Sequence, residues 1–420
     1  MNSRLARLHP YPFARLAELL EGVDGNSDLA PISLAVGEPK HRPPPLVAAA
    51  LTAQLDQLNR YPPTAGIQEL RGAIANWLEG RFALGTNTID PSTMVLPAVG
   101  TREALFALAQ AIVSVDDGSE ASKPLVVMPS PFYQIYEGAA IMAGAEPYYL
   151  PCERACGGMP DYDAVAPDVW RRCQLLYLCS PGNPTGAVHK LADLQKLIAL
   201  ADQYDFVIAS DECYSEIYID ESAPPPSLLS ACRGLGRDRF ERCIVFNSLS
   251  KRSSVPGLRS GLVAGDPDII AAFLLYRTYH GSAMPLHHQW ASVAAWADED
   301  HVVANRATYR KKLTAVHAIL STVMDVELPA GGFCLWPIVG GDDTRFVRDL
   351  FEQQHVTALP GSYLGRDLPR DTGGCSGAEQ LVAGSLDNAG SGHLRLALVF
   401  PLDVCIEAAE RIVTFVAQRR

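Results

Sequence analysis

The sequence lacks long apolar runs and paired cysteines, and each absence excludes a class of protein. No stretch of about 18 or more apolar residues occurs, so we expect no membrane span. The N-terminal stretch "MNSRLARLHPYPFARL" has early arginines but no apolar core, and it does not resemble a signal peptide. None of the ten cysteines forms a C-x-x-C pair, and Cys152 and Cys156 have no matching Cys/His pair at zinc spacing. We therefore expect a cytoplasmic protein with free thiols and no metal site.

Positive charge is also scarce. The 35 Lys and Arg residues are outnumbered by 47 Asp and Glu residues, which gives a net charge of −12. This balance argues against a general nucleic-acid binder and against binding to an anionic membrane surface. It does not argue against a small anionic ligand in a local basic pocket.

What is present is a long chain with enough apolar residues for a sizeable core. Its 420 residues are two to three times the length of about 150 that serves as a prior for one domain, so two domains are expected. Apolar residues make up 48% of the chain and charged residues 20%, which is typical of a folded protein.

Short apolar runs alternate with amphipathic helix patterns through the middle of the chain. Helix patterns such as "REALFALAQAIVSV" and "LADLQKLIALADQY" have apolar residues at helical spacing. We predict buried strands at six apolar runs, namely "MVLPA", "LVVM", "QLLYLCS", "FVIAS", "CIVFNS" and "SGLVAG". Such alternation predicts an α/β fold with a mostly parallel sheet.

The pattern changes after Pro285, where long helices, short strands and a final helix are typical of a smaller α+β domain. We therefore divide the chain into three parts. These are an N-terminal segment at 1–35 that packs with the small domain, a large domain at 36–288 and a small C-terminal domain at 289–420. The Gly-, Ser- and Asp-rich stretch at 365–393 is predicted to be a loop.

Polar motifs follow several of the predicted strands. Ligands of open α/β sheets bind beyond the carboxyl ends of the strands, so these motifs are candidate site residues. Gly100 and Thr101 end a strand and open a helix, where free amides bind phosphate well, although a plain helix cap is the more common case. In "CSPGNPTG", two prolines and two glycines fix a turn that can aim Asn183 inward, although these are ordinary loop residues.

A carboxylate pair ends the strand "FVIAS". Asp211 and Glu212 follow the strand directly, and Tyr214 comes shortly after them. A carboxylate at the end of a buried strand needs a partner. A cationic ring nitrogen, an arginine or a helix N-terminus would each serve, and this motif alone does not choose among them.

Lys251 lies in the serine-rich bend "NSLSKRSSVPGLRSG" and is either a surface lysine or a nucleophilic amine. As a nucleophile it needs a pKa below its usual value of about 10.4, and burial and the nearby Arg259 would both lower that pKa. Ser248 and Arg259 are also suited to hold a phosphate, because the guanidinium offers a planar fork of donors.

The order of these motifs is more specific than any one of them. A phosphate-type turn, an Asn turn, a strand-end Asp with Tyr three residues on, and S-x-x-K with Arg eight residues later follow one another along the chain. In this order the chain resembles the fold type I, pyridoxal-phosphate-dependent aminotransferases of class I and II over nearly its full length. The resemblance implies an α/β fold with a large cofactor-binding domain on a mostly parallel seven-stranded sheet, and a smaller α+β domain.

The resemblance also implies roles for individual residues. Lys251 would hold the cofactor pyridoxal 5′-phosphate covalently and shuttle a proton, and Asp211 would pair with the protonated ring nitrogen. Asn183 and Tyr214 would contact the phenolic oxygen of the cofactor, and Tyr133 would stack on its ring. The phosphate would be bound by Gly100, Thr101, Arg102, Ser248 and Arg259 of the same chain and by Tyr61 across the interface of a homodimer.

Gly37, Asn183 and Arg395 are implied to bind the amino-acid and 2-oxo-acid substrates. Arg395, in "HLRLALV", would grip the α-carboxylate and orient the amino acid. Such orientation can supply several of the ~7–11 kcal/mol available in well-positioned systems.

Three stretches, "RLHPYPFARLAELL", "YRTYHGSAMP" and "LPGSYLGR", resemble the bacterial N-succinyl-diaminopimelate aminotransferases of lysine biosynthesis. Those enzymes exchange the amino group with glutamate and 2-oxoglutarate. Because these substrates carry additional carboxylates, a second cation is expected near the site. Arg277 is a candidate for it, with a structural role at a helix end as the alternative. The stretch at 366–393 is longer than expected for this subgroup, which leaves the specificity open.

Other functions stay open alongside this one. An aspartate or aromatic aminotransferase, or a C–S lyase, would use the same fold and cofactor. A DNA-binding regulator with this fold as effector domain needs a helix-turn-helix module, and only about 35 residues precede "VGEP". A nicotinamide-dependent dehydrogenase would show G-x-G-x-x-G after its first strand, and that motif is absent there.

Overall fold

The larger part of the protein is built on one eight-stranded sheet. The computed structural model describes residues 1–115, 123–369 and 386–419. In spatial order the strands of this sheet are β2 (Val95–Ala98), β9 (Gly261–Gly265), β8 (Cys243–Ser248), β7 (Val207–Asp211), β6 (Cys173–Cys179), β3 (Leu125–Ser130), β4 (Glu146–Glu153) and β5 (Met159–Pro160). Strands β8, β7, β6, β3 and β4 pair in parallel, whereas β9 is antiparallel to both of its neighbours.

The predicted mostly parallel sheet is confirmed, and all six predicted runs form strands of it. The seventh long strand, β4, has mostly half-buried residues, so it lacks the continuous apolar run by which the others were found. An eighth strand, the two-residue β5, adds an antiparallel edge to the predicted seven.

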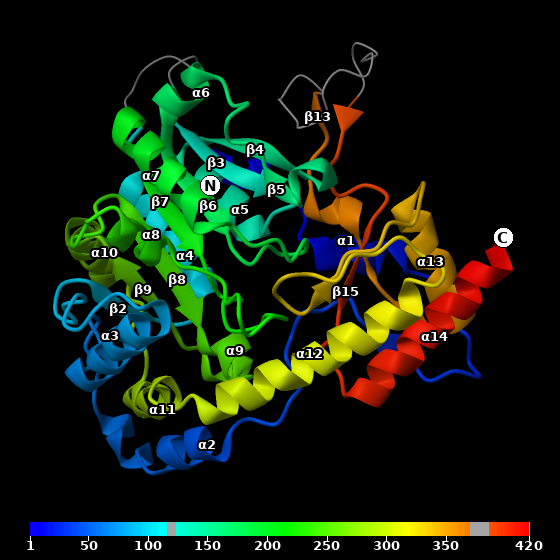
Figure 1. Ribbon diagram of the computed structural model, residues 1–420, viewed down its shortest axis with the longest axis horizontal. Coiled ribbons are helices and arrows are strands. Elements are labelled where there is room, and N and C mark those ends of the chain that lie inside the picture. The colour runs from blue at the N-terminus through cyan, green and yellow to red at the C-terminus, as the bar shows by residue number, and fades with distance from the viewer. Residues whose placement is uncertain (116–122, 370–385, 420) are drawn as a thin grey trace.

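Helices cover both faces of the sheet (Figure 1). Neighbouring strand residues alternate between two apolar clusters: Val127 and Leu176 belong to one, and Val126 and Leu175 to the other. The first cluster is completed by helices α2 (Pro45–Thr52), α3 (Gln68–Phe82), α7 (Leu191–Tyr204), α8 (Leu228–Gly234) and α11 (Leu286–Trp296). The second is completed by α4 (Thr101–Ile112), α5 (Gln134–Ala143) and α10 (Pro267–His280).

A second apolar core lies in the C-terminal part of the chain. Its three-stranded sheet has the order β10 (Cys334–Leu335), β15 (Leu394–Ala397) and β12 (Leu359–Pro360). The long helices α12 (Asp300–Leu320) and α14 (Leu402–Arg419) lie side by side against it, together with α13 (Asp343–Gln354) (Figure 1). The remaining elements are α6 (Pro167–Arg172), α9 (Leu249–Arg252), β11 (Val356–Thr357), β13 (Leu368–Pro369), β14 (Leu386–Asp387) and the 3₁₀ turns η1 (Ser3–Arg7), η2 (Leu55–Asn59), η4 (Arg154–Cys156), η5 (Pro256–Leu258) and η6 (Gly361–Leu364).

The N-terminal segment contacts both parts of the protein. Helix α1 (Pro12–Leu19) contributes Leu16 to the second core, and β1 (Ile32–Ser33) pairs with β11. The turn η1 instead packs on α5, and Arg4 donates to the carbonyl of Met142. The predicted division at 35/36 and 288/289 stays a prediction. Helix α11 crosses the second boundary and packs with α2 and α3 of the large part.

Two further findings bear on the expectations from composition. No helix in the described part of the chain is long and apolar enough to cross a membrane. Among the described residues eight cysteines are free thiols. Cys156 is disulfide-bonded, which corrects the expectation of a free thiol at that position.

Candidate functional site

A cavity of about 530 Å³ opens beyond the carboxyl ends of β7 and β8. This is the edge at which open α/β sheets bind their ligands. The structure brings together at this cavity eleven of the residues that the sequence singled out. They are Gly37, Thr101, Arg102, Tyr133, Asn183, Asp211, Tyr214, Ser248, Lys251, Arg259 and Arg395.

Lys251 lies on α9, the single helical turn that follows β8, and its amine points into the cavity. The Nζ atom donates to the main-chain carbonyl of Gly37 at 2.6 Å and lies 5.1 Å from the centre of the Phe333 ring. Desolvation by burial lowers the pKa of the Lys251 amine to about 8. A larger fraction of this amine is therefore neutral and nucleophilic near neutral pH than of an ordinary lysine.

Asp211 is the last residue of β7 and is buried. Its carboxylate accepts hydrogen bonds from the Tyr136 hydroxyl at 2.8 Å and from the Cys213 amide at 3.2 Å. Burial raises the pKa of Asp211, and no ion pair to a cationic side chain is found for it within the described residues. A carboxylate that is buried without a cation costs free energy, so this end of the cavity suits a ligand with a positive charge.

A second part of the cavity lining, here called the phosphate end, is formed by a helix N-terminus and two backbone turns. Gly100 precedes α4 with a φ of 78°, and a Cβ atom at this position would lie 2.2 Å from the Arg259 guanidinium. A larger residue here would be strained at this φ and would displace the Arg259 guanidinium from the first turn of α4. The Ser248 hydroxyl is nearby on the lining and donates to the carbonyl of Ser260 at 3.3 Å. Amides of a helix start, a hydroxyl and a guanidinium together make a site for a phosphate group.

Arg395 enters the cavity from β15 of the C-terminal part. Its Nη2 donates to the carbonyl of Ala35 at 2.7 Å, and its Nη1 contacts the Asn183 side-chain oxygen at 3.4 Å. The Nε atom is buried without a hydrogen-bond partner. A buried guanidinium with unused donors can accept a carboxylate from a ligand.

Aromatic side chains form one wall of the cavity. Arg102 donates from Nε to the Tyr133 hydroxyl at 2.8 Å and from Nη2 to the Tyr11 hydroxyl at 3.3 Å. Tyr11 and Phe13 line the cavity although we did not predict them, because the stretch "HPYPF" gave only a turn signal. Tyr136 was missed for another reason: an isolated tyrosine in a helix pattern carries no sign of its hydrogen bond to Asp211.

Two candidates lie outside the cavity lining. Gly100 lies close to the guanidinium of the lining residue Arg259. The Tyr61 side chain is fully exposed, at 101% of its reference area. The long loop at 366–393 falls largely outside the described residues, because residues 370–385 are not described.

The structure corrects the proposed substrate role of Arg277. This side chain is fully buried and does not line the cavity. It donates to the carbonyl of Pro97 at 2.7 Å, and its Nε lies 3.4 Å from a Glu103 carboxylate oxygen. Arg277 therefore ties α10 to α4 and β2, which is the structural role that the sequence had left as the alternative.

The chain is similar to known proteins over almost its whole length. Residues 30–372 match the family model described as Aminotransferase class I and II. The chain is 30% identical to the LL-diaminopimelate aminotransferase of Aquifex aeolicus, with 98% of each chain covered. It is 29% identical to the protein of the same name from Nitratidesulfovibrio vulgaris, with 87% of this chain and 92% of that protein covered.

Solved structures with the same fold include two aminotransferases. One, from Neisseria meningitidis, is 44% identical and superimposes with a TM-score of 0.90, covering 99% of this chain and 100% of the other. The other is the aminotransferase AspB of Helicobacter pylori, at 32% identity and a TM-score of 0.85, covering 98% and 99%.

Proposed function

The chain belongs to the class I and II aminotransferases, and from this premise we propose that Lys251 is the residue that binds the family's cofactor, pyridoxal 5′-phosphate. When bound, this cofactor withdraws electrons from the α-carbon of an amino acid, so that the amino group can be exchanged with that of a 2-oxo acid. The observation that carries the proposal is the Lys251 amine, which burial brings to a pKa of about 8 inside the cavity.

The other residues of the cavity fit this cofactor. Asp211 is a buried carboxylate that lacks a cation, and a protonated pyridine nitrogen would supply one. Gly100, Thr101 and Arg259 offer amides and a guanidinium to the phosphate. The aromatic ring of Tyr133 lines the same cavity and is available for stacking. Four further residues line the same cavity, and we propose roles for them on that basis. Ser248 and the main-chain amide of Arg102 would bind the phosphate. Asn183 and Tyr214 would contact the phenolic oxygen.

In the reaction, the chain's own residues bind and orient the substrate and move one proton. We propose that Arg395 receives the α-carboxylate, because its Nε is unpaired and its Nη1 hydrogen bond to Asn183 is long. The Gly37 carbonyl accepts a hydrogen bond from the Lys251 amine at 2.6 Å. We propose that this contact holds the amine when it is not bonded to the cofactor, and that the amine then acts as a base toward the α-carbon.

We propose that the amino donor is a diaminopimelate, in its N-succinylated form, with 2-oxoglutarate as acceptor. Support comes from curated relatives named LL-diaminopimelate aminotransferase at 29–30% identity. Such substrates need a second cation, and Arg277 is unavailable. Among described residues that line the cavity, the arginines are Arg102, Arg259 and Arg395, and Arg102 at the aromatic wall is the one we propose for the distal carboxylate.

The first experiment tests the cofactor assignment. Wild-type protein incubated with pyridoxal 5′-phosphate should gain a visible absorbance band that survives gel filtration, and Lys251→Ala should not. Lys311→Ala, which removes another lysine of the chain, is the matched control and should retain the band. A colourless wild type that takes up no cofactor would refute the assignment.

A second experiment separates the candidate substrates. The loaded enzyme is mixed in turn with N-succinyl-diaminopimelate, free diaminopimelate, glutamate, aspartate and tyrosine, and the loss of the visible band is followed. The succinylated donor should react fastest, and Arg102→Gln should weaken it more than alanine. Faster reaction of aspartate or tyrosine would contradict the donor assignment. Release of pyruvate and ammonia without an acceptor would indicate a C–S lyase.

We also propose that the enzyme is a homodimer in which Tyr61 reaches the phosphate of the partner site. Large apolar side chains are exposed on η2 and α10: Leu58 at 68%, Leu275 at 63% and Tyr279 at 87% of their reference areas. Light scattering should give twice the chain mass. Mixing Lys251→Ala protein with Tyr61→Phe protein should restore activity, because each hybrid dimer regains one intact site. A mixture no more active than its separate parts would rule out the shared site.

A further inference from the structure

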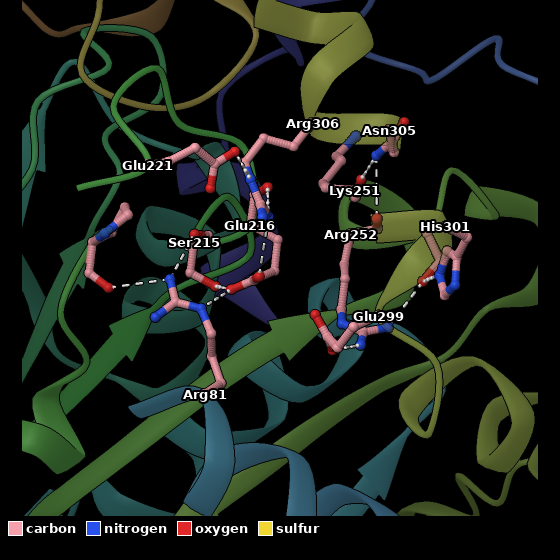
Figure 2. A network of polar contacts seen from close by, with 12 residues as sticks. Arg81, Ser215, Glu216, Glu221, Lys251, Arg252, Glu299, His301, Asn305 and Arg306 are labelled. Carbon is pink, nitrogen blue, oxygen red and sulfur yellow. Dashed lines mark hydrogen bonds and ion pairs between the residues drawn. The ribbon is translucent and has the colours of Figure 1, made fainter. Parts of the chain in front are cut away.

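The main chain of Lys251 is held by a side chain from a distant helix. Asn305 of α12 donates from its Nδ2 to the carbonyl of Lys251 at 3.0 Å and to the carbonyl of Arg252 at 3.1 Å (Figure 2). These two carbonyls belong to α9, which has only four residues. A helix this short is not stable by itself, so its position depends on such outside contacts.

The orientation of Asn305 is determined by chemistry. Carbonyl oxygens only accept hydrogen bonds, so the NH₂ group must face α9 and the side-chain oxygen must face His41, whose Nδ1 lies 2.8 Å away. His41 therefore carries its proton on Nδ1. Burial and the nearby Lys312 lower the pKa of His41, which keeps the ring neutral. Its free Nε2 accepts from the Lys312 amine at 2.6 Å.

The hydrogen bonds thus form one directed chain from Lys312 through His41 and Asn305 to the main chain of Lys251. Lys312 is buried and also donates to the carbonyl of Leu398 at 3.2 Å, so the far end of the chain is fixed in the C-terminal part. At each contact of this chain a donor faces an acceptor: the Lys312 amine donates to His41, His41 donates to Asn305, and Asn305 donates to the carbonyls of α9.

The loop that carries His41 also receives the amine of Lys251. The Gly37 carbonyl accepts from Nζ at 2.6 Å, and the His41 carbonyl accepts from the Ser254 hydroxyl at 3.4 Å. The loop at 37–41 thus contacts Lys251 at the tip of its side chain and, through Asn305, at its main chain.

Helix α12, which carries Asn305, is itself fixed by other contacts. Arg306, the next residue, donates to the carbonyl of Glu216 at 3.3 Å and pairs with Glu221 at 3.0 Å (Figure 2). Asn305 is therefore held on a helix that is tied to the segment after β7 as well as to the C-terminal core.

We propose that Asn305, oriented by His41 and Lys312, is a positioning residue that fixes the main chain of Lys251 and thereby the place of its amine in the cavity. The inference rests on the proposed function of Lys251. A displacement of about 1 Å in a reacting group can cost about 100-fold in rate, so a fixed main chain matters for a side chain with four rotatable bonds. The motif analysis did not identify any of these three residues.

The test compares Asn305→Ala with Thr308→Ala. Thr308 lies on the same helix, is exposed, and bonds only to the carbonyl of Ala304 one turn back, so it is the matched control. Asn305→Ala should slow cofactor uptake by the cofactor-free protein, followed by the visible band, and lower kcat by about 10- to 100-fold with little change in KM. Thr308→Ala should match the wild type in both.

A second pair of variants tests the orientation by His41. His41→Phe keeps a ring that can pack on Tyr309, whose ring centre lies 4.6 Å from that of His41, but it removes both nitrogens. It should slow cofactor uptake and lower kcat in the same direction as Asn305→Ala, but less. His41→Gln retains a donor and an acceptor and should recover part of the uptake rate. A purely structural role would lower the melting temperature in both variants without separating their uptake rates.

Three outcomes overturn the inference: uptake and kcat of Asn305→Ala equal to those of Thr308→Ala, an effect on KM alone, or no difference between the two His41 variants. If Asn305→Ala does not fold, Asn305→Asp replaces it, because a carboxylate of the same shape still accepts from His41 but cannot donate to α9. Failure of the proposed function is distinguishable, because Lys251→Ala would then take up the cofactor with an unchanged band.

Discussion

The two ends of the cavity are assembled in different ways. The phosphate end uses Gly100, Thr101, Ser248 and Arg259, which lie at the ends of β2, β9 and β8, three neighbouring strands of one sheet. The end at which a substrate carboxylate is proposed to bind, here called the carboxylate end, is formed by Arg395. This side chain donates to the carbonyl of Ala35, 360 residues away in the chain. The first end is fixed by local turns and hydrogen-bonded strands, whereas the second depends on how the C-terminal part packs on the sheet.

The largest expected effect concerns Asp211, which belongs to the sheet. Asp211→Asn keeps the shape and the contact with Tyr136 but removes the charge, and we expect kcat to fall about 10²- to 10³-fold, as is typical when a preorganised charge is lost. Steady-state kinetics of the loaded enzyme measures it. Glu212→Gln is the control, because Glu212 is bound to the Leu228 amide at 2.8 Å and does not line the cavity. Equal losses in both variants would contradict the assignment.

The next effect concerns the carboxylate end. Arg395→Ala should lower kcat/KM for every amino donor by about 10- to 100-fold, because a hydrogen bond to a charged group contributes about 1.5–3 kcal/mol. The maximal cofactor uptake reached at high pH should stay close to that of the wild type. Arg277→Lys serves as the comparison, since that arginine is buried away from the cavity. It should lower the melting temperature and leave the ratio of kcat/KM for dicarboxylic donors to kcat/KM for neutral donors unchanged. A change in that ratio would restore Arg277 as a substrate residue.

A smaller effect is expected at the phosphate end. Gly100→Ala places a Cβ 2.2 Å from the Arg259 guanidinium at a φ of 78°. Strain of this kind costs about 1–3 kcal/mol, so the dissociation constant of the cofactor should rise about tenfold or more. Equilibrium dialysis of the cofactor measures it. Gly72→Ala, on α3 with open space around its Cβ, should bind the cofactor normally and gain about 0.5–1 kcal/mol of stability.

The smallest effect is a shift in pH dependence. In the proposed role the amine of Lys251 reacts when neutral. Because burial brings its pKa to about 8, cofactor uptake should rise as the pH increases through 8 and level off near pH 9. An ordinary lysine would continue to gain neutral amine up to about pH 10. Arg395 lowers the pKa of Lys251, so Arg395→Ala should move the curve to higher pH while Gly100→Ala leaves it in place. A curve that moves in both variants would show that the two ends are not independent.

Much of the sheet was predictable because its strands are buried on both faces and form continuous apolar runs. Strand β4 was not found individually, since its residues are half-buried and mixed in character. The order of motifs led to Lys251 and Asp211 because Asp211 ends one buried strand and Lys251 lies in the turn that follows the next. The sequence left Arg277 open between a substrate role and a structural role, because a buried arginine on an interior helix and a substrate-binding arginine look alike in a sequence.

The amino-acid sequence by itself determined the alternation of strands and helices, and with it which residues stand at strand ends. It determined this because strand burial and helix periodicity are encoded over a few residues each. Only the tertiary structure decided that Asn305, His41 and Lys312 form one hydrogen-bonded chain to the main chain of Lys251, and that Arg277 stays outside the cavity. Contacts across more than two hundred residues depend on the packing of two apolar cores, and no local pattern in the chain specifies them.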